Sequence, residues 1–197
     1  MIVDTMSYTE IREYIFNNKP DDDKIQNFFY KNLRRSCIKL PNGYILNTMY
    51  VANINGITYY AVFQKDKKLD FSAAIFATFF YKGSIRVVSL SHDNTLQWFT
   101  SHYRERVVER TSNDKYTLKT FFKSIIPFMT EVGNPIYLNC GNTGFVQKGM
   151  LHIIDSSIPS IMIYKTIIPL EREDYVNRQL ITSKLNELNY RKRYSVV

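Results

Sequence analysis

The chain has 197 residues, of which 45% are hydrophobic and 15% are aromatic, with only 7 Gly and 6 Pro. This composition excludes a disordered or collagen-like chain, and we predict a single α+β domain over 1–197. With 26 Lys and Arg against 18 Asp and Glu, the formal net charge is +8. A positive field attracts polyanions such as nucleic acid, although a soluble basic protein without such a partner has the same composition.

We expect no targeting or membrane segment in this sequence. Residues 1–6 lack the basic and apolar regions of a secretory signal, and no run of 18 apolar residues occurs. The longest apolar stretch, 73–81, is too short to span a bilayer and indicates a buried strand or a buried helix. Cys37 and Cys140 have no Cys-x-x-Cys partner, which favours free thiols in a reducing compartment over a disulfide. We therefore expect a cytoplasmic protein without a membrane segment.

Two helices are predicted at the start of the chain. Ser7 and Glu10 have the spacing of a capping box, and apolar residues then recur at helical spacing, which predicts a helix over 7–17. A second helix follows three aspartates and ends at Arg34 and Arg35. Acid at the start and base at the end suit the helix macrodipole, and the two arginines are also candidate contacts for nucleic acid.

Between residues 37 and 90 the hydrophobic period changes to that of strands. Turn residues separate runs rich in strand formers, such as 44–51 and 57–63, so a meander of antiparallel strands is predicted there. The charged run 65–68 indicates a solvated turn within this meander. A strand over 85–90 then leads to the segment on which the functional interpretation rests.

That segment, 98–110, is where a histidine, several arginines and two carboxylates fall together. At about 100° per residue, His102, Arg106 and Arg110 share one stripe of a helix, and a neighbouring apolar stripe can face a core. Thr100 or the serine after it can cap the helix, which places the histidine in the first turn, where backbone amides favour anions. The stripe expected to face the core holds Phe99, Tyr103 and Val107.

Downstream of this segment the sequence predicts another helix and a second group of strands. Capping residues at 111–114 precede an apolar helical pattern that ends near Pro127 or Met129. The predicted fold is α+β: two N-terminal helices, a mainly antiparallel sheet over about 37–168, a central helix that carries His102, and a C-terminal helix. The later strands are expected at 136–140, 145–154 and 161–168, and the closing helix at 171–188.

The pattern His-x3-Arg-x2-Glu-Arg, formed here by His102, Arg106, Glu109 and Arg110, resembles a motif of the RelE/BrnT-like toxin superfamily of small bacterial and phage proteins. It is also similar to a motif in an uncharacterised group of Bacteroidetes and phage proteins, and residues 164–168 followed by Gln179 resemble the closing strand and helix of that group. Understood members of the toxin superfamily are endoribonucleases with a small α+β fold. The resemblance therefore implies a metal-independent, cofactor-free RNase of toxin type, with RNA expected over DNA and an antitoxin as a possible protein partner.

Cleavage of RNA without a metal needs a group that removes a proton from the ribose 2′-hydroxyl, donors that stabilise the charged phosphorane, and an acid for the leaving oxygen. His102 is the candidate for the proton steps, and Arg106 and Arg110 are candidates for holding phosphate oxygens. Glu109 is expected to orient an arginine or to act as a second base. The predicted nucleic-acid surface adds Trp98 and Tyr103 as platforms for bases, with Arg104, Arg34 and Arg35.

Three other interpretations fit the same residues. The segment can be a surface helix with an ion pair between Arg106 and Glu109 and a half-buried histidine. A hydrolytic metal site is a weaker alternative, because three groups without a recognised ligand spacing would have to converge in space: His92 with Asp93, His102 with Glu105, and His152. A non-enzymatic bacterial or phage protein that binds protein or nucleic acid also fits the aromatic and basic composition.

Overall fold

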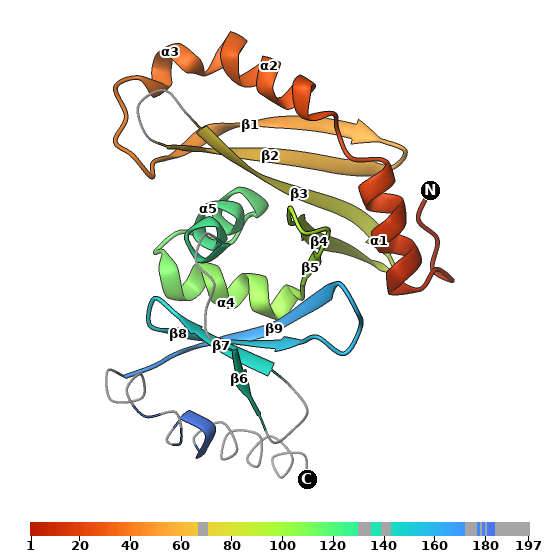
Figure 1. Cartoon of the computed structure of the whole chain (residues 1–197), viewed down its shortest axis with the longest axis vertical. Coiled ribbons are helices and arrows are strands. Elements are labelled where there is room, and N and C mark those ends of the chain that lie inside the picture. The colour runs from red at the N-terminus through yellow and green to blue at the C-terminus, as the bar shows by residue number, and fades with distance from the viewer. Residues whose placement is uncertain are drawn as a thin grey trace. The chain divides into compact units, whose positions relative to one another are not determined.

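The computed structural model describes residues 1–66, 71–129, 135–138, 143–171, 177, 179 and 181–183. The chain divides into two compact units, unit 1 (Met1–Phe99) and unit 2 (Thr100–Val197). Both units combine helices with antiparallel strands, so the predicted α+β class is confirmed (Figure 1). The single domain over 1–197 stays a prediction.

Unit 1 is built on a meander in which each strand pairs antiparallel with the next one along the chain (Figure 1). Two-residue turns at Asn55-Gly56 and Lys82-Gly83 have positive φ at both positions, as the tightest hairpin turns require. The apolar stretch 73–81 forms a strand of this sheet. The strands are β1 (Ile45–Ile54), β2 (Ile57–Lys65), β3 (Phe71–Tyr81), β4 (Ser84–Leu90) and β5 (Leu96–Phe99).

Three helices belong to unit 1: α1 (Tyr8–Asn17), α2 (Asp22–Asn32) and the short α3 (Arg34–Cys37). Ser7 and Glu10 form the predicted capping box of α1, and Asp21 caps α2. The second predicted helix is interrupted at Leu33, so the two arginines lie in α3 instead of at the end of α2. One side of α2 and α3 packs on the sheet in a buried cluster of Ile25, Phe29, Leu33, Cys37, Leu46, Ala61 and Phe63.

Lys65 corrects the prediction of a solvated turn over 65–68. It lies at the end of β2 with only 7% of its surface exposed. Its ammonium donates hydrogen bonds to the carbonyl oxygens of Ile38, at 3.2 Å, and of Leu40. A buried charge is tolerated only when its hydrogen bonds are made, so Lys65 fastens the chain just after α3 to the sheet. Lys67 and Lys68 lie outside the described residues.

The predicted helical stripe is wrong at Phe99. In β5, Phe99 pairs with Val87 and Trp98 pairs with Val88, so strand pairing continues to the end of unit 1. The following helix begins only at Ser101. Because alternate residues of a strand face opposite sides, Trp98 and Phe99 follow the strand period and not the helical one.

The described part of unit 2 contains four strands, ordered β9-β8-β7-β6 with antiparallel pairing, two helices that precede them, and further helical residues at 179 and 181–183. The single strand predicted over 145–154 is wrong, because Lys148 and Gly149 both have positive φ and form a hairpin turn. The elements are α4 (Ser101–Thr111), α5 (Leu118–Met129), β6 (Pro135–Tyr137), β7 (Thr143–Gln147), β8 (Met150–Asp155) and β9 (Ile161–Pro169).

The predicted cap of α5 at 111–114 is also wrong. Ser112 ends α4, and α5 starts after Thr117, whose hydroxyl oxygen accepts a hydrogen bond from the Thr120 amide at 3.0 Å. The predicted helix 171–188 falls mostly outside the described residues, and Cys140 lies outside them as well. No helix in the described part of the chain is long and apolar enough to cross a membrane.

Candidate functional site

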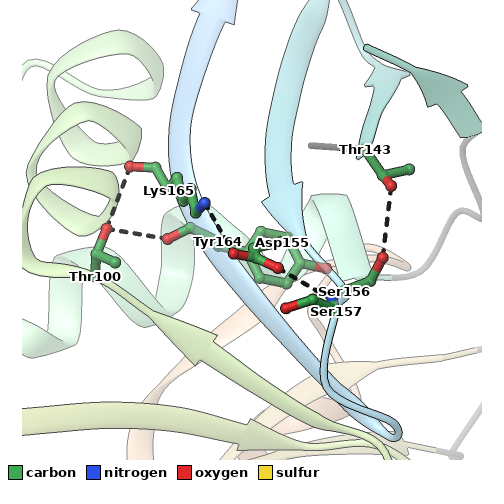
Figure 2. Close-up of polar contacts among 7 residues, drawn as sticks. All are labelled: Thr100, Thr143, Asp155, Ser156, Ser157, Tyr164 and Lys165. Atoms are coloured by element: carbon green, nitrogen blue, oxygen red, sulfur yellow. Dashed lines mark hydrogen bonds and ion pairs between the residues drawn. The ribbon is translucent and has the colours of Figure 1, made fainter. Parts of the chain in front are cut away.

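The start of α4 is capped and tied to β9. Thr100 is the N-cap, and its hydroxyl oxygen accepts a hydrogen bond from the Tyr103 amide at 3.2 Å. The same hydroxyl lies within donating distance of the carbonyl oxygens of Tyr164, at 3.0 Å, and Lys165, at 3.2 Å (Figure 2). One of the two predicted caps is thus confirmed, and His102 lies in the first helical turn.

Strand β9 is irregular where it meets the start of α4. Ile153 pairs with Thr166, whereas the next residue, Ile154, pairs with Tyr164, so Lys165 is an additional residue on β9. A bulge of this kind bends a strand and re-aims its side chains. The two carbonyl groups that anchor the cap of α4 come from this bulge.

A polar cluster that the sequence analysis did not assign lies beside the bulge (Figure 2). The Lys165 ammonium lies 2.9 Å from a carboxylate oxygen of Asp155, whose other oxygen accepts a hydrogen bond from the Ser157 amide at 3.0 Å. Hydrogen bonds from Ser157 and then Lys165 lower the pKa of Asp155 to about 2. The hydroxyl groups of Ser156 and Thr143 lie 3.5 Å apart. In the sequence, the Asp-Ser-Ser run at 155–157 is typical of a turn stabilised by side-chain hydrogen bonds, and this signal could have indicated the cluster.

The predicted stripe of α4 is accessible to solvent. His102 is exposed, and its Nε2 lies 3.4 Å from the Thr166 hydroxyl. Arg106 Nη1 lies 2.6 Å from Glu109 Oε2, with 40% and 60% of the side chains exposed. Arg110 is half-buried, and its pKa is lowered by burial and then by the charge of Arg106, against the opposing effect of Glu109. The ion pair between Arg106 and Glu109, which the alternative surface-helix interpretation predicts, is present.

The stripe does not gather its members at one point. Glu109 follows His102 by seven positions, which corresponds to about 10 Å of helix rise. Glu109 is therefore placed to orient Arg106 and not to share one phosphodiester group with His102. The Thr166 hydroxyl, from β9, lies 3.4 Å from Nε2 of the imidazole.

The opposite side of α4 is locked into the core of unit 2. The Tyr103 hydroxyl lies 2.8 Å from Nδ1 of His152, and its ring lies 5.1 Å from that of Tyr164. Burial raises the pKa of both tyrosines. His152 has no exposed surface, its ring stacks on Phe145 at 4.7 Å, and burial lowers its pKa to about 4. Its Nε2 has no hydrogen-bond partner among the described residues.

Three residues predicted to contact nucleic acid have structural roles instead. Trp98 is 3% exposed, and rings of unit 1 surround it, including Tyr8 at 4.9 Å, so no face is open to a base. Tyr103 is fully buried. Arg104 is 8% exposed and donates a hydrogen bond to the Tyr116 hydroxyl at 2.8 Å, which ties α4 to the segment before α5. Helical spacing had placed Tyr103 on the stripe expected to face the core, which is where it lies, but it gave no sign that Trp98 and Arg104 are buried.

The metal interpretation finds no support in the geometry. No group of three or more His, Cys, Asp and Glu side chains in the described part of the chain could hold a metal ion. His152 is enclosed by aromatic rings, whereas His92 belongs to unit 1 and lines a groove of about 430 Å³ with Asp22 and Asp23 of α2. Apart from His92, this groove contains none of the predicted site residues.

Comparison with protein-family models, with curated proteins and with solved structures finds no match. The resemblance to the toxin superfamily therefore rests on the motif of α4 alone.

Proposed function

We propose that this protein binds RNA, in preference to DNA, through the exposed stripe of α4. The observation that carries the proposal is the spacing of His102, Arg106 and Arg110, which lie one turn apart on one side of a helix whose other side is fixed by the core. Because packing against the core prevents α4 from rotating about its axis, the hydrogen-bond donors of the stripe keep fixed positions relative to one another. We place this function in the cytoplasm of a bacterium or of a phage-infected cell.

Arg106 is the central phosphate contact of this proposal. Its guanidinium has five N–H donors, of which the bond from Nη1 to Glu109 uses one. The remaining donors can pair with phosphate oxygens in charge-assisted bonds. Glu109 reduces the local positive charge, but it also restricts the Arg106 side chain and lowers the entropy lost on binding.

Fluorescence anisotropy with a labelled single-stranded RNA tests the proposal. Arg106→Ala should weaken binding and make it less sensitive to salt, because each lost phosphate contact removes counterion release. Lys119→Ala, at an exposed position of α5, is the charge-matched control and should retain wild-type affinity. Equal affinities for wild type and Arg106→Ala would rule out α4 as the RNA-binding surface.

Metal-independent cleavage of the bound RNA is a second candidate function. It is favoured by the exposed His102 imidazole, with the Thr166 hydroxyl at 3.4 Å and Arg106 one turn away. In this proposal His102 transfers the proton and Arg106 stabilises the phosphorane. In a toxin, an antitoxin protein would cover this stripe.

The cleavage assay uses labelled RNA in excess EDTA. His102→Ala should lower the rate by a factor on the order of 10² to 10⁴, because a proton-transfer group contributes that much. Its RNA affinity should remain close to wild type. Binding without any cleavage by the wild-type chain would instead leave a non-enzymatic RNA-binding protein.

A further inference from the structure

Positive charge is concentrated in one segment of unit 1. Residues 24–65 contain six Lys and Arg and no Asp or Glu. The rest of the chain holds 20 Lys and Arg against 18 Asp and Glu, so this segment accounts for +6 of the net charge of +8. Because this stretch of 42 residues contains no carboxylate, its cations have no acidic partner within the segment itself.

The fold gathers most of these cations around the end of α2 and α3. Lys31 is in the last turn of α2, Arg34 and Arg35 are in α3, and Lys39 lies two positions beyond the end of α3; all four are exposed. Lys65 is the buried cation whose hydrogen bonds to the backbone after α3 hold this part of the chain against the sheet. The four exposed charges are thus displayed from a segment with a fixed conformation.

An aromatic ring lies among these charges. Tyr30 is 44% exposed, and its ring meets Phe29 at 5.8 Å and Phe71 at 6.1 Å in edge-to-face contacts that fix it on the core. The Arg34 guanidinium lies 5.6 Å from the centre of the same ring. Aromatic rings and guanidinium planes both stack on unpaired bases, and the neighbouring cations suit the phosphates between those bases.

The helix macrodipole explains only part of this arrangement. It favours a cation in the last turn of a helix, as Lys31 provides in α2. It does not account for Lys39, which lies beyond α3, for the half-exposed ring of Tyr30, or for the lack of carboxylates through β2. These features together match a surface that combines phosphate contacts with stacking.

We infer that Tyr30, Lys31, Arg34, Arg35 and Lys39 form a second RNA-binding surface, the α2–α3 surface, which takes single-stranded RNA by stacking on Tyr30 and Arg34 and by phosphate contacts from the other three cations. It belongs to unit 1 and goes beyond the α4 stripe of the proposed function. It shares with that proposal only the class of partner.

The test measures binding of a labelled oligouridine to the full chain by fluorescence anisotropy at several salt concentrations. Arg34→Ala/Arg35→Ala should weaken binding at least tenfold, because it removes one stacking group and one phosphate contact, and it should reduce the salt slope by about 0.7, the contribution of the single phosphate contact of Arg35. Tyr30→Ala should weaken binding at least about fivefold, whereas Tyr30→Phe, which keeps the ring, should bind like wild type.

The matched control is Lys19→Ala/Lys82→Ala, which removes two exposed charges of unit 1 outside the α2–α3 surface. It should change the affinity by less than about twofold, because it alters only the net charge and removes no contact to RNA. All variants must melt at the wild-type temperature for the comparison to count. A loss as large in this control as in the arginine pair, or wild-type affinity of the arginine pair, overturns the inference.

Two further outcomes separate this surface from other possibilities. If a duplex RNA binds as tightly as oligouridine and Tyr30→Ala binds like wild type, the α2–α3 surface is a general polyanion surface and the single-strand inference is wrong. If Arg34→Ala/Arg35→Ala loses affinity while Arg106→Ala does not, the α4 proposal fails and this inference stands. If Arg106→Ala loses affinity while Arg34→Ala/Arg35→Ala does not, the inference is wrong and the α4 proposal is supported.

Discussion

Arg106 and Glu109 form an ion pair of 2.6 Å across one turn of α4, with both side chains open to solvent. Exposed pairs of this kind contribute about 0.2–1 kcal/mol to the free energy of unfolding, because water screens the charges. Arg106→Ala and Glu109→Ala should therefore each change stability by less than about 1 kcal/mol in urea unfolding. A loss above 3 kcal/mol, as for a buried pair, would show that the pair is a structural element of the fold.

RNA affinity should respond differently to the same two substitutions. Arg106→Ala removes a phosphate contact, whereas Glu109→Ala removes a carboxylate that repels phosphate and should leave affinity unchanged or increase it. Anisotropy titrations of both variants at one salt concentration check this. Weaker binding by Glu109→Ala, by as much as Arg106→Ala, would mean that orientation of Arg106 matters more than the charge of Glu109.

Thr100 combines an N-cap with a bond to the bulge of β9. Thr100→Ala should destabilise unit 2 by about 1–2 kcal/mol, because the Tyr103 amide loses its acceptor. Thr100→Ser keeps both hydrogen bonds and should restore most of this stability. Chemical unfolding of the two variants measures the difference, and equal losses in both would assign the effect to the methyl group instead of the hydroxyl.

His152 should make the fold sensitive to acid. Its pKa is lowered to about 4 in the folded state, from an ordinary value of 6.5, so between these values only the unfolded chain binds the proton. The contribution of the neutral His152 side chain to the free energy of unfolding is fully present above pH 6.5 and declines as the pH falls to 4. The total loss should be about 3 kcal/mol, since one pKa unit corresponds to about 1.4 kcal/mol.

Urea unfolding at a series of pH values between 7.5 and 4 measures this loss. His152→Gln should start from a lower stability but show a shallower decline, because glutamine does not titrate. Parallel curves for the two proteins would show that other groups dominate the acid sensitivity.

Lys65 should be among the more costly side chains of unit 1 to replace. Lys65→Met keeps the apolar stem but removes the donor of the hydrogen bonds to the carbonyl groups of Ile38 and Leu40, and a hydrogen bond from a charged donor contributes about 1.5–3 kcal/mol. Hydrogen exchange of the amides around α3 should accelerate in this variant. Unchanged exchange there would mean that Lys65 does not hold this segment in place.

The sequence by itself determined the local features. Capping at Ser7 and Thr100 and the hairpin turn at Asn55-Gly56 follow from neighbouring residues alone. The exposed stripe of His102 and Arg106 was also predictable, because the helical period decides which side chains share a side. The α+β class follows from the same local patterns.

Only the tertiary structure decided which polar and aromatic side chains are buried. Tyr103 meets His152 from 49 residues away, and Lys65 meets Ile38 from 27 residues away. Lys165 finds Asp155 only because β8 and β9 pair across a bulge. Local periodicity contains no information about such partners. Burial of a polar group depends on whether a distant segment supplies its hydrogen bond, and that is settled by the packing of the whole unit.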